Sequence, residues 1–164
     1  DLLTRAGWVV ADADKVDLSA ARGVAIREFP LAGGGFADYL LYVDGRACGV
    51  IEAKKQGATL TGVEVQSARY QQGLPPALPA WRRPLPFAYE STGLETHFTN
   101  GLDPDARARN VFAFHRPEML RAWLDAALAP VAGDTEQGSK VGTFLTRVRQ
   151  MPPLVTEWGD FKLW

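Results

Sequence analysis

The chain has 164 residues, of which 46% are hydrophobic, and a formal net charge of −1. This length and composition predict one soluble globular domain with a core of its own. The net charge argues against a protein that binds nucleic acid over its whole surface, but it is compatible with a local basic groove. No apolar run is long enough to cross a bilayer and no secretory signal opens the chain, so we expect a cytoplasmic protein.

The first elements in chain order are a short helix, a strand and a hairpin. Helical spacing of apolar residues opens the chain at 1–7, and residues 17–23 suit one further helical turn. Strands are expected at 24–31, 36–43 and 46–54, the last two joined at the turn pair Asp44-Gly45. The single cysteine, Cys48, lies inside a predicted strand, which excludes an intramolecular disulfide and indicates a core position.

The remaining elements are two helices and a second group of strands. Thr61 and Glu64 have capping-box spacing at the start of a helix that runs to about Gly73. A proline-rich extended loop follows at 74–86. Short strands are expected at 87–92, 96–100 and 110–114, and an amphipathic helix at 117–128. The order predicts an α/β (α+β) fold, a central mixed β-sheet flanked by helices. Residues 130–140 look like a linker, and the tail after them has weak helical character.

An acid and a base end the second hairpin strand on one face. Side chains alternate across a strand, so Glu52 and Lys54 project together. Whether Asp38 joins them depends on the hairpin register, because a shift of one residue moves every side chain to the opposite face. A two-residue loop pairs Val43 with Arg46 and sets Asp38 opposite Ile51, away from Glu52.

A three-residue loop closed by a left-handed Gly45 pairs Tyr42 with Arg46 instead. Asp38 then lies opposite Val50, on the face of Glu52 and diagonal to it. We predict this bulged loop, because the chemistry requires the two carboxylates on one face.

Two carboxylates at that spacing suit Mg²⁺, which takes a few carboxylate oxygens and keeps several waters. One such water can attack a phosphodiester while the metal neutralises charge on the phosphate. Lys54 can orient that water, help to deprotonate it, or stabilise the developing charge. The alternative is a strand that ends in a solvated charge cluster, and the local pattern leaves both interpretations open.

The helix that follows can add to this site. Gln66 and Tyr70 are four residues apart and share one face, where they can bond a DNA phosphate or position the lysine. An ordinary amphipathic helix with a half-buried tyrosine explains the same spacing. His97 and His115 have no ligand partners at metal-binding spacing and are interpreted as structural. The arginine pairs 82–83 and 107/109 line either a DNA path or solvated loops.

Several stretches together resemble a known family. Asp38, then Glu52-Ala53-Lys54, then Gln66 to Tyr70 resemble the PD-(D/E)xK nuclease superfamily with its Gln-x-x-x-Tyr element. "AGW", "ADYLLYVDGRACGVIEAKK", "FAYESTGLETHFTN" and "FHRPEML" resemble the N-terminal endonuclease domain of the R (restriction, or motor) subunit of type I restriction enzymes.

The resemblance implies a restriction-endonuclease-like core and a Mg²⁺-dependent cut in double-stranded DNA. It implies that Asp38 and Glu52 are metal ligands and catalytic together with Lys54, and that Gln66, Tyr70 and Arg69 support the site or contact DNA. Asp1 is a candidate for a further acid. The implied partners are DNA and the methylation and specificity subunits, which would choose the target.

The domain division follows from the same resemblance. Residues 1–129 would be the nuclease domain, and residues 130–164 a linker and C-terminal segment that leads toward a translocase domain not present in this chain. "GDTEQGSK" lacks the Ser or Thr that must follow the phosphate-loop lysine, so ATP is expected only for the absent translocase. The alternative function is a catalytically inactive nuclease-like module for DNA binding or subunit docking.

Overall fold

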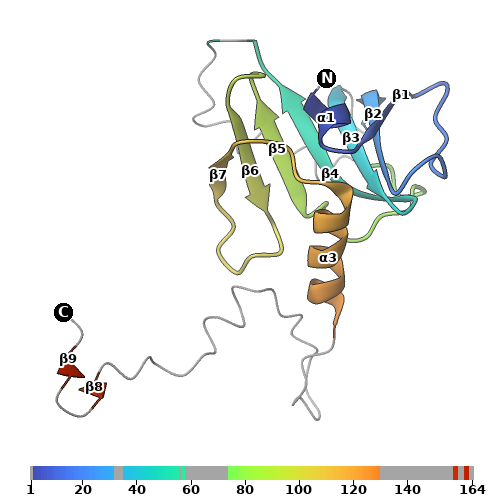
Figure 1. Ribbon diagram of the computed structural model, residues 1–164. Coiled ribbons are helices and arrows are strands. Elements are labelled where there is room, and N and C mark those ends of the chain that lie inside the picture. Colours follow the sequence, from blue (N-terminus) through green and yellow to red (C-terminus); the bar gives the residue numbers. More distant parts are fainter. Residues whose placement is uncertain are drawn as a thin grey trace.

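Seven strands form one mixed sheet in the order β1-β2-β3-β4-β5-β6-β7, in the computed structural model of the chain (Figure 1). The structure describes residues 2–31, 35–55, 57 and 74–129, and the backbone of 157–158 and 161–162. The strands are Val9–Asp12 (β1), Gly23–Pro30 (β2), Phe36–Val43 (β3), Arg46–Ala53 (β4), Phe87–Ser91 (β5), Thr96–Asn100 (β6) and Ala108–Val111 (β7). The pairs β1–β2 and β4–β5 are parallel and the others antiparallel, which confirms the mixed sheet.

Two helices among the described residues, α1 (Leu2–Arg5) and α3 (Pro117–Leu128), lie on the same face of this sheet (Figure 1). Pro117 begins α3 as expected, and its buried stripe of Leu120, Leu124 and Ala127 packs with Leu3 of α1 over the sheet. Neither helix in this part of the chain has the length and apolar character that a bilayer span requires.

The two faces of the sheet have separate hydrophobic clusters. The face under α1 and α3 contributes Leu41, Cys48, Ile51, Phe87 and Tyr89. The opposite face contributes Leu40, Tyr42, Ala47, Val50 and Ala88, which pack with Leu74 and Leu85 of the proline-rich segment. The core position predicted for Cys48 is confirmed, and burial raises the pKa of its thiol well above the usual range.

The structure differs from the predicted elements in four places. Residues 9–12, for which no element was predicted, form the parallel edge strand β1. Residues 17–23, expected to form a helical turn, contain no helix, and β2 begins at Gly23. The last strand of the sheet occupies Ala108–Val111 rather than 110–114. In the tail, expected to be weakly helical, Glu157–Trp158 (β8) and Phe161–Lys162 (β9) pair as two short antiparallel strands. The helix expected at 61–73, with Gln66, Arg69 and Tyr70, lies outside the described residues, as does Asp1.

The hairpin loop is shorter than predicted. Val43 pairs with Arg46, so the loop is the two-residue turn Asp44-Gly45, and both residues have positive φ (47° and 73°) as a type I′ turn requires. The predicted pairing of Tyr42 with Arg46 is therefore wrong.

The bulge that the chemistry needs lies inside the ladder instead. Tyr42 pairs with Ala47 and Leu41 with Gly49, so Cys48 is an extra residue in β4. Beyond it the register continues as Leu40 with Val50 and Tyr39 with Ile51. The prediction that Asp38 and Glu52 share one face of the sheet is therefore right. The prediction that Asp38 lies opposite Val50 is wrong.

Gly49 lies on β4 in close contact with β5. It pairs with Phe87 across the parallel ladder, and a Cβ atom at Gly49 would lie 2.6 Å from the carbonyl oxygen of Phe87. A glycine is therefore required at this position, and it sets the spacing of the two strands that continue into Glu52 and Glu90.

Candidate active site

Asp38 and Glu52 occupy directly opposite positions on β3 and β4. Tyr39 pairs with Ile51, so the next position along the antiparallel ladder brings Asp38 to Glu52, on one face of the sheet. The carboxylate of Asp38 bends toward β4 and accepts a hydrogen bond of 2.6 Å from the backbone N–H of Ala53. Local strand pairing thus brings together two of the residues that the sequence singled out.

Lys54 contacts Glu52 directly. Its Nζ lies 2.5 Å from Oε1 of Glu52, and its backbone N–H donates to the carbonyl oxygen of Ser91 at 2.7 Å. Glu52 is only 8% exposed, so the ammonium group offsets the cost of burying that carboxylate. The ion pair occupies an oxygen that a metal ion would use, and metal binding would compete with the lysine.

Glu90 is an acid of this site that sequence reasoning missed. It pairs with Glu52 across the parallel β4–β5 ladder and is 4% exposed. Because register partners share a face, its side chain projects beside that of Glu52. A signal was available in "FAYES", where a glutamate stands beside hydrophobic residues in a predicted strand. The structure buries all five residues of that strand. A glutamate without function or counter-charge is rarely fully buried.

The acidic row continues across the sheet. His97 in β6 pairs with Glu90 and is half-buried on the same face. The row Asp38, Glu52, Glu90 and His97 therefore crosses four neighbouring strands at one level, with Lys54 one step further along β4. The structural role expected for His97 stays a prediction, and the register places this histidine beside Glu90.

His115, by contrast, belongs to the core under α3. Its Nδ1 lies 2.7 Å from the hydroxyl of Tyr89, and its backbone oxygen accepts a hydrogen bond from the indole of Trp8. Its ring packs against Phe98 and Trp123. Burial lowers the pKa of His115 and raises that of Tyr89. These contacts agree with the structural role predicted for His115.

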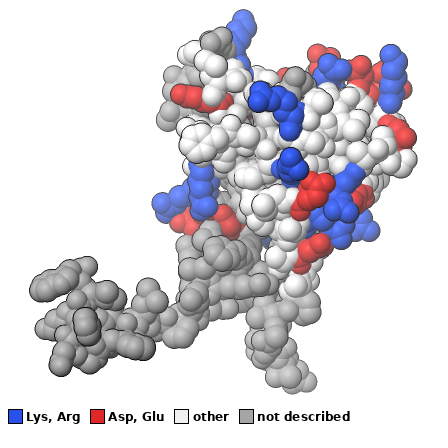
Figure 2. Space-filling model, viewed as in Figure 1, with Lys and Arg blue, Asp and Glu red and all other residues white. Residues whose placement is uncertain are grey.

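Three of the four arginines considered for a DNA path, Arg83, Arg107 and Arg109, have partners of their own. Arg83 donates to carbonyl oxygens of the proline-rich segment, namely those of Leu74, Pro75, Pro76 and Leu78. Arg107 pairs with Asp105 at 2.6 Å and Arg109 with Asp103 at 3.6 Å. Basic groups also lie beside acidic groups on the face seen in Figure 2. The chain's near-neutral charge is therefore mixed on that face rather than concentrated into a basic area.

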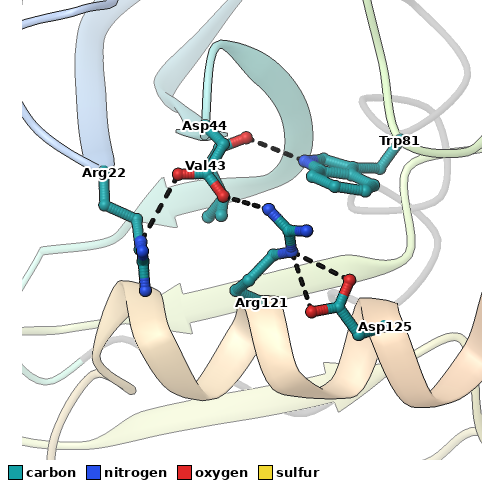
Figure 3. A network of polar contacts seen from close by, with 6 residues as sticks. All are labelled: Arg22, Val43, Asp44, Trp81, Arg121 and Asp125. Carbon is teal, nitrogen blue, oxygen red and sulfur yellow. Dashed lines mark hydrogen bonds and ion pairs between the residues drawn. The ribbon is translucent and has the colours of Figure 1, made fainter.

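A polar network away from the acids fixes the far end of the hairpin (Figure 3). Asp44 at the turn forms ion pairs with Arg22 and with Arg121 of α3. The indole of Trp81 donates to the carbonyl oxygen of Val43 at 2.8 Å, and the guanidinium of Arg121 lies 4.6 Å from the centre of the Trp81 ring. The network ties α3 and the proline-rich segment to the turn of the hairpin that carries Asp38 and Glu52.

The donor set fits a hard divalent cation only in part. Asp38 and Glu52 offer carboxylate oxygens from one face, as Mg²⁺ prefers, and the remaining positions can be taken by water and phosphate oxygens. Within the described ranges, no three His, Cys, Asp or Glu side chains stand close enough to hold a metal as they are. These residues fit two ligands of an open site rather than a closed cage.

The fold and this group of side chains define an α/β domain with two carboxylates and a lysine at the meeting of a hairpin and a parallel strand pair. Residues 13–84, somewhat under half of the chain, match the family described as the second domain of the type I restriction enzyme EcoKI endonuclease subunit. Over this segment the chain is similar to the endonuclease subunit of a type I restriction enzyme, in agreement with the predicted resemblance. Comparisons with curated proteins and with solved structures gave no match.

The matched segment contains Asp38, Glu52 and Lys54 and ends before Glu90. Its description names a second domain, whereas the resemblance was to an N-terminal domain of that subunit. The position of the domain within a longer subunit therefore stays a prediction, as does membership of the PD-(D/E)xK superfamily.

Proposed function

We propose that this chain is the Mg²⁺-dependent endonuclease domain of a type I restriction enzyme R subunit, which hydrolyses phosphodiester bonds of double-stranded DNA. The observation that supports it is the shared face of Asp38 and Glu52, with Lys54 in contact with Glu52, inside a segment that matches the restriction enzyme family. Target choice would belong to specificity and methylation subunits, so the domain cuts without reading sequence itself.

Each residue has a distinct role in this proposal. Asp38 and Glu52 bind the metal, and the N–H of Ala53 holds the Asp38 carboxylate toward β4. A bound Mg²⁺ supplies charge neutralisation on the phosphate and a water of lowered pKa. Lys54 donates a hydrogen bond to the attacking water or to the phosphate oxygen on which charge develops. Gln66, Arg69 and Tyr70 are proposed to support Lys54 or contact DNA.

The wider assembly is part of the same proposal. Residues 1–129 would form the nuclease domain, and 130–164 would lead toward an ATP-driven translocase elsewhere in a longer protein. The domain would work in the cytoplasm, where the DNA and the partner subunits are found. ATP would bind only to the translocase.

A second candidate is a nuclease-like module that binds DNA or docks subunits without cutting. The observation that favours it is the absence, among the described side chains, of three metal ligands already close together. In that case the pairing of Lys54 with Glu52 would be a permanent ion pair that stabilises the sheet.

Metal titration separates the two functions. Mg²⁺ and Mn²⁺ are titrated by calorimetry into the 164-residue chain and into Asp38→Ala, Glu52→Ala and, as an exposed control, Glu95→Ala. The nuclease proposal expects binding that the first two substitutions abolish and the control preserves. Binding that ignores Asp38 and Glu52 would contradict it. In the complete restriction complex, Asp38→Ala, Glu52→Ala and Lys54→Ala should each abolish DNA cleavage, and retained cutting by all three would reject the assignment.

A further inference from the structure

Three exposed apolar side chains lie at the end of the sheet that carries the acids. Among the large hydrophobic residues that the structure describes, Phe112, Leu94 and Phe36 have the greatest exposure: Phe112 is fully exposed, Leu94 is 75% exposed and Phe36 is 62% exposed. Scattered single apolar side chains are normal on a protein surface, whereas exposed apolar groups gathered in one region indicate an interaction site. The positions of these three residues in the sheet are therefore informative.

Leu94 and Phe112 lie together on one side of the acids. Strands β4 and β5 run parallel and end at the same level, and Leu94 lies in the turn that joins β5 to β6. Strand β7 runs back toward that turn, and its last residue, Val111, pairs with Thr96 at the start of β6. Phe112 comes one residue later, so it lies beside the turn that carries Leu94. We call Leu94 and Phe112 the apolar corner.

Phe36 lies on the other side of the acids. It opens β3, two residues before Asp38, and β3 runs antiparallel to β4. The start of β3 and the end of β4 are therefore at the same end of the sheet. Glu52 and Glu90 thus lie on the strands between Phe36 and the apolar corner. Neighbouring strands are about 4.8 Å apart, so β3 and β7 are separated by about 19 Å.

The proposed substrate limits the contacts that these side chains can make. In a paired duplex the bases are stacked on one another, and a protein meets mainly phosphate and sugar. Apolar and aromatic side chains contact base faces where the stacking is interrupted, because the side chain then takes the place of a neighbouring base. Such contacts accept any base, which agrees with a domain that cuts without reading sequence. At about 3.4 Å of axis per nucleotide, 19 Å corresponds to about six nucleotides.

We propose that Phe36 and the apolar corner contact unstacked bases on the two sides of the phosphate that is held at the acids. The domain therefore prefers DNA that is unpaired over about six nucleotides to a fully paired duplex. This inference rests on the proposed function, because it names the form of DNA that the same site takes. The role is one of binding, and the three side chains take no part in the hydrolysis itself.

The test compares two DNA probes. Fluorescence anisotropy measures binding of the 164-residue chain to a labelled duplex of about 30 base pairs, and to the same duplex with about six mismatched pairs in its centre. Ca²⁺ replaces Mg²⁺, so that the acids keep a hard cation. We expect the mismatched probe to bind at least about fivefold more tightly than the paired probe, because only its bases are free to stack on protein side chains.

Phe112→Ala should lower the affinity for the mismatched probe by about tenfold, which is the size of one base-stacking contact, and change that for the paired probe by less than about twofold. Phe36→Ala and Leu94→Ser should act in the same direction. Phe112→Trp keeps an aromatic face and should restore the wild-type affinity. Leu128→Ala removes an exposed apolar side chain at the end of α3 and is the matched control.

Several outcomes would overturn the inference. They are equal affinity of the wild-type chain for the two probes, a preference that survives Phe112→Ala and Phe36→Ala, and an equal loss for both probes in these variants. Unchanged DNA binding in every variant would assign the three side chains to a protein contact instead. If the chain binds neither probe, the inference is overturned, and the metal titration described above decides the proposed function separately. Circular dichroism establishes that each variant is folded.

Discussion

Asp38 on β3 accepts a 2.6 Å hydrogen bond from the backbone of Ala53 on β4, one residue beyond Glu52. The bond joins the two strands at the point where the antiparallel ladder brings their acids together. It uses one carboxylate oxygen and orients the group without neutralising its charge. The structural role of Asp38 depends on an oxygen that accepts this hydrogen bond, and its metal-binding role depends on the negative charge. A substitution that keeps the oxygen and removes the charge can therefore distinguish the two roles.

Asp38→Asn should separate them. The asparagine carbonyl oxygen can still accept the bond from Ala53, so we expect the free energy of unfolding to change by less than about 1 kcal/mol, whereas Asp38→Ala should cost more. Mg²⁺ affinity should fall in both variants because the charge is gone. Urea unfolding and calorimetry measure the two effects. An asparagine variant as unstable as the alanine variant would show that charge, rather than the hydrogen bond, holds the strands.

Lys54→Met should increase Mg²⁺ affinity while it abolishes cleavage. The substitution removes the cation that competes for Oε1 of Glu52 and preserves the aliphatic stem. We expect an affinity gain of several-fold in calorimetry. Lys55→Met, the exposed neighbour, is the control and should change little. Weaker binding in Lys54→Met would mean that the lysine supports the metal site rather than competing with it.

Gly49→Ala should destabilise the centre of the sheet. A Cβ at this position would meet the carbonyl oxygen of Phe87 at 2.6 Å, so β4 and β5 would have to separate. Overpacking of this kind costs about 1–3 kcal/mol, and here backbone must move, so the upper end is expected in urea unfolding. Ala53→Ser, at an exposed position of the same strand, should be close to neutral. A Gly49→Ala variant of full stability would contradict the close approach.

The stability of the domain should fall in mild acid because of His115. Burial lowers the pKa of His115, so the folded state keeps the ring neutral while the unfolded chain takes up a proton at higher pH. The stabilisation is present above the unfolded pKa of about 6.5 and is lost as the pH falls through the lower folded value. His115→Asn should reduce this dependence when urea unfolding is compared between pH 7.5 and 5. An unchanged slope would exclude His115 as its source.

The hairpin illustrates what the sequence could predict. Alternation in "FADYLLYV" and "RACGVIEAK" predicts the two strands, and Asp44-Gly45 predicts the turn between them. The requirement for both acids on one face led to the right conclusion with the wrong pairing. A bulge in the loop and a bulge at Cys48 restore the same face, and nothing local in the sequence distinguishes them. The close contact of Gly49 with Phe87 of β5, two residues far apart in the sequence, is likewise not visible in the local pattern.

Glu90 illustrates what local reasoning misses. Strand β5 follows β4 only after the segment 54–86, and the parallel pairing that sets Glu90 beside Glu52 depends on the path of that connection. Sequence periodicity predicts a buried strand there but not its neighbour. The sequence shows that the strand contains Glu90, but it does not show that Glu90 pairs with Glu52.

The extra residue at Cys48 has a consequence for how related chains are compared. A hairpin that lacked Cys48 would run as an uninterrupted ladder from its turn, and Asp38 would still meet Glu52. A hairpin with one further insertion and no second bulge would turn the acids to opposite sides. The number of residues between the two acids can therefore be one smaller without separating them. A search pattern with a fixed number of residues between the acids would miss related chains that keep the site.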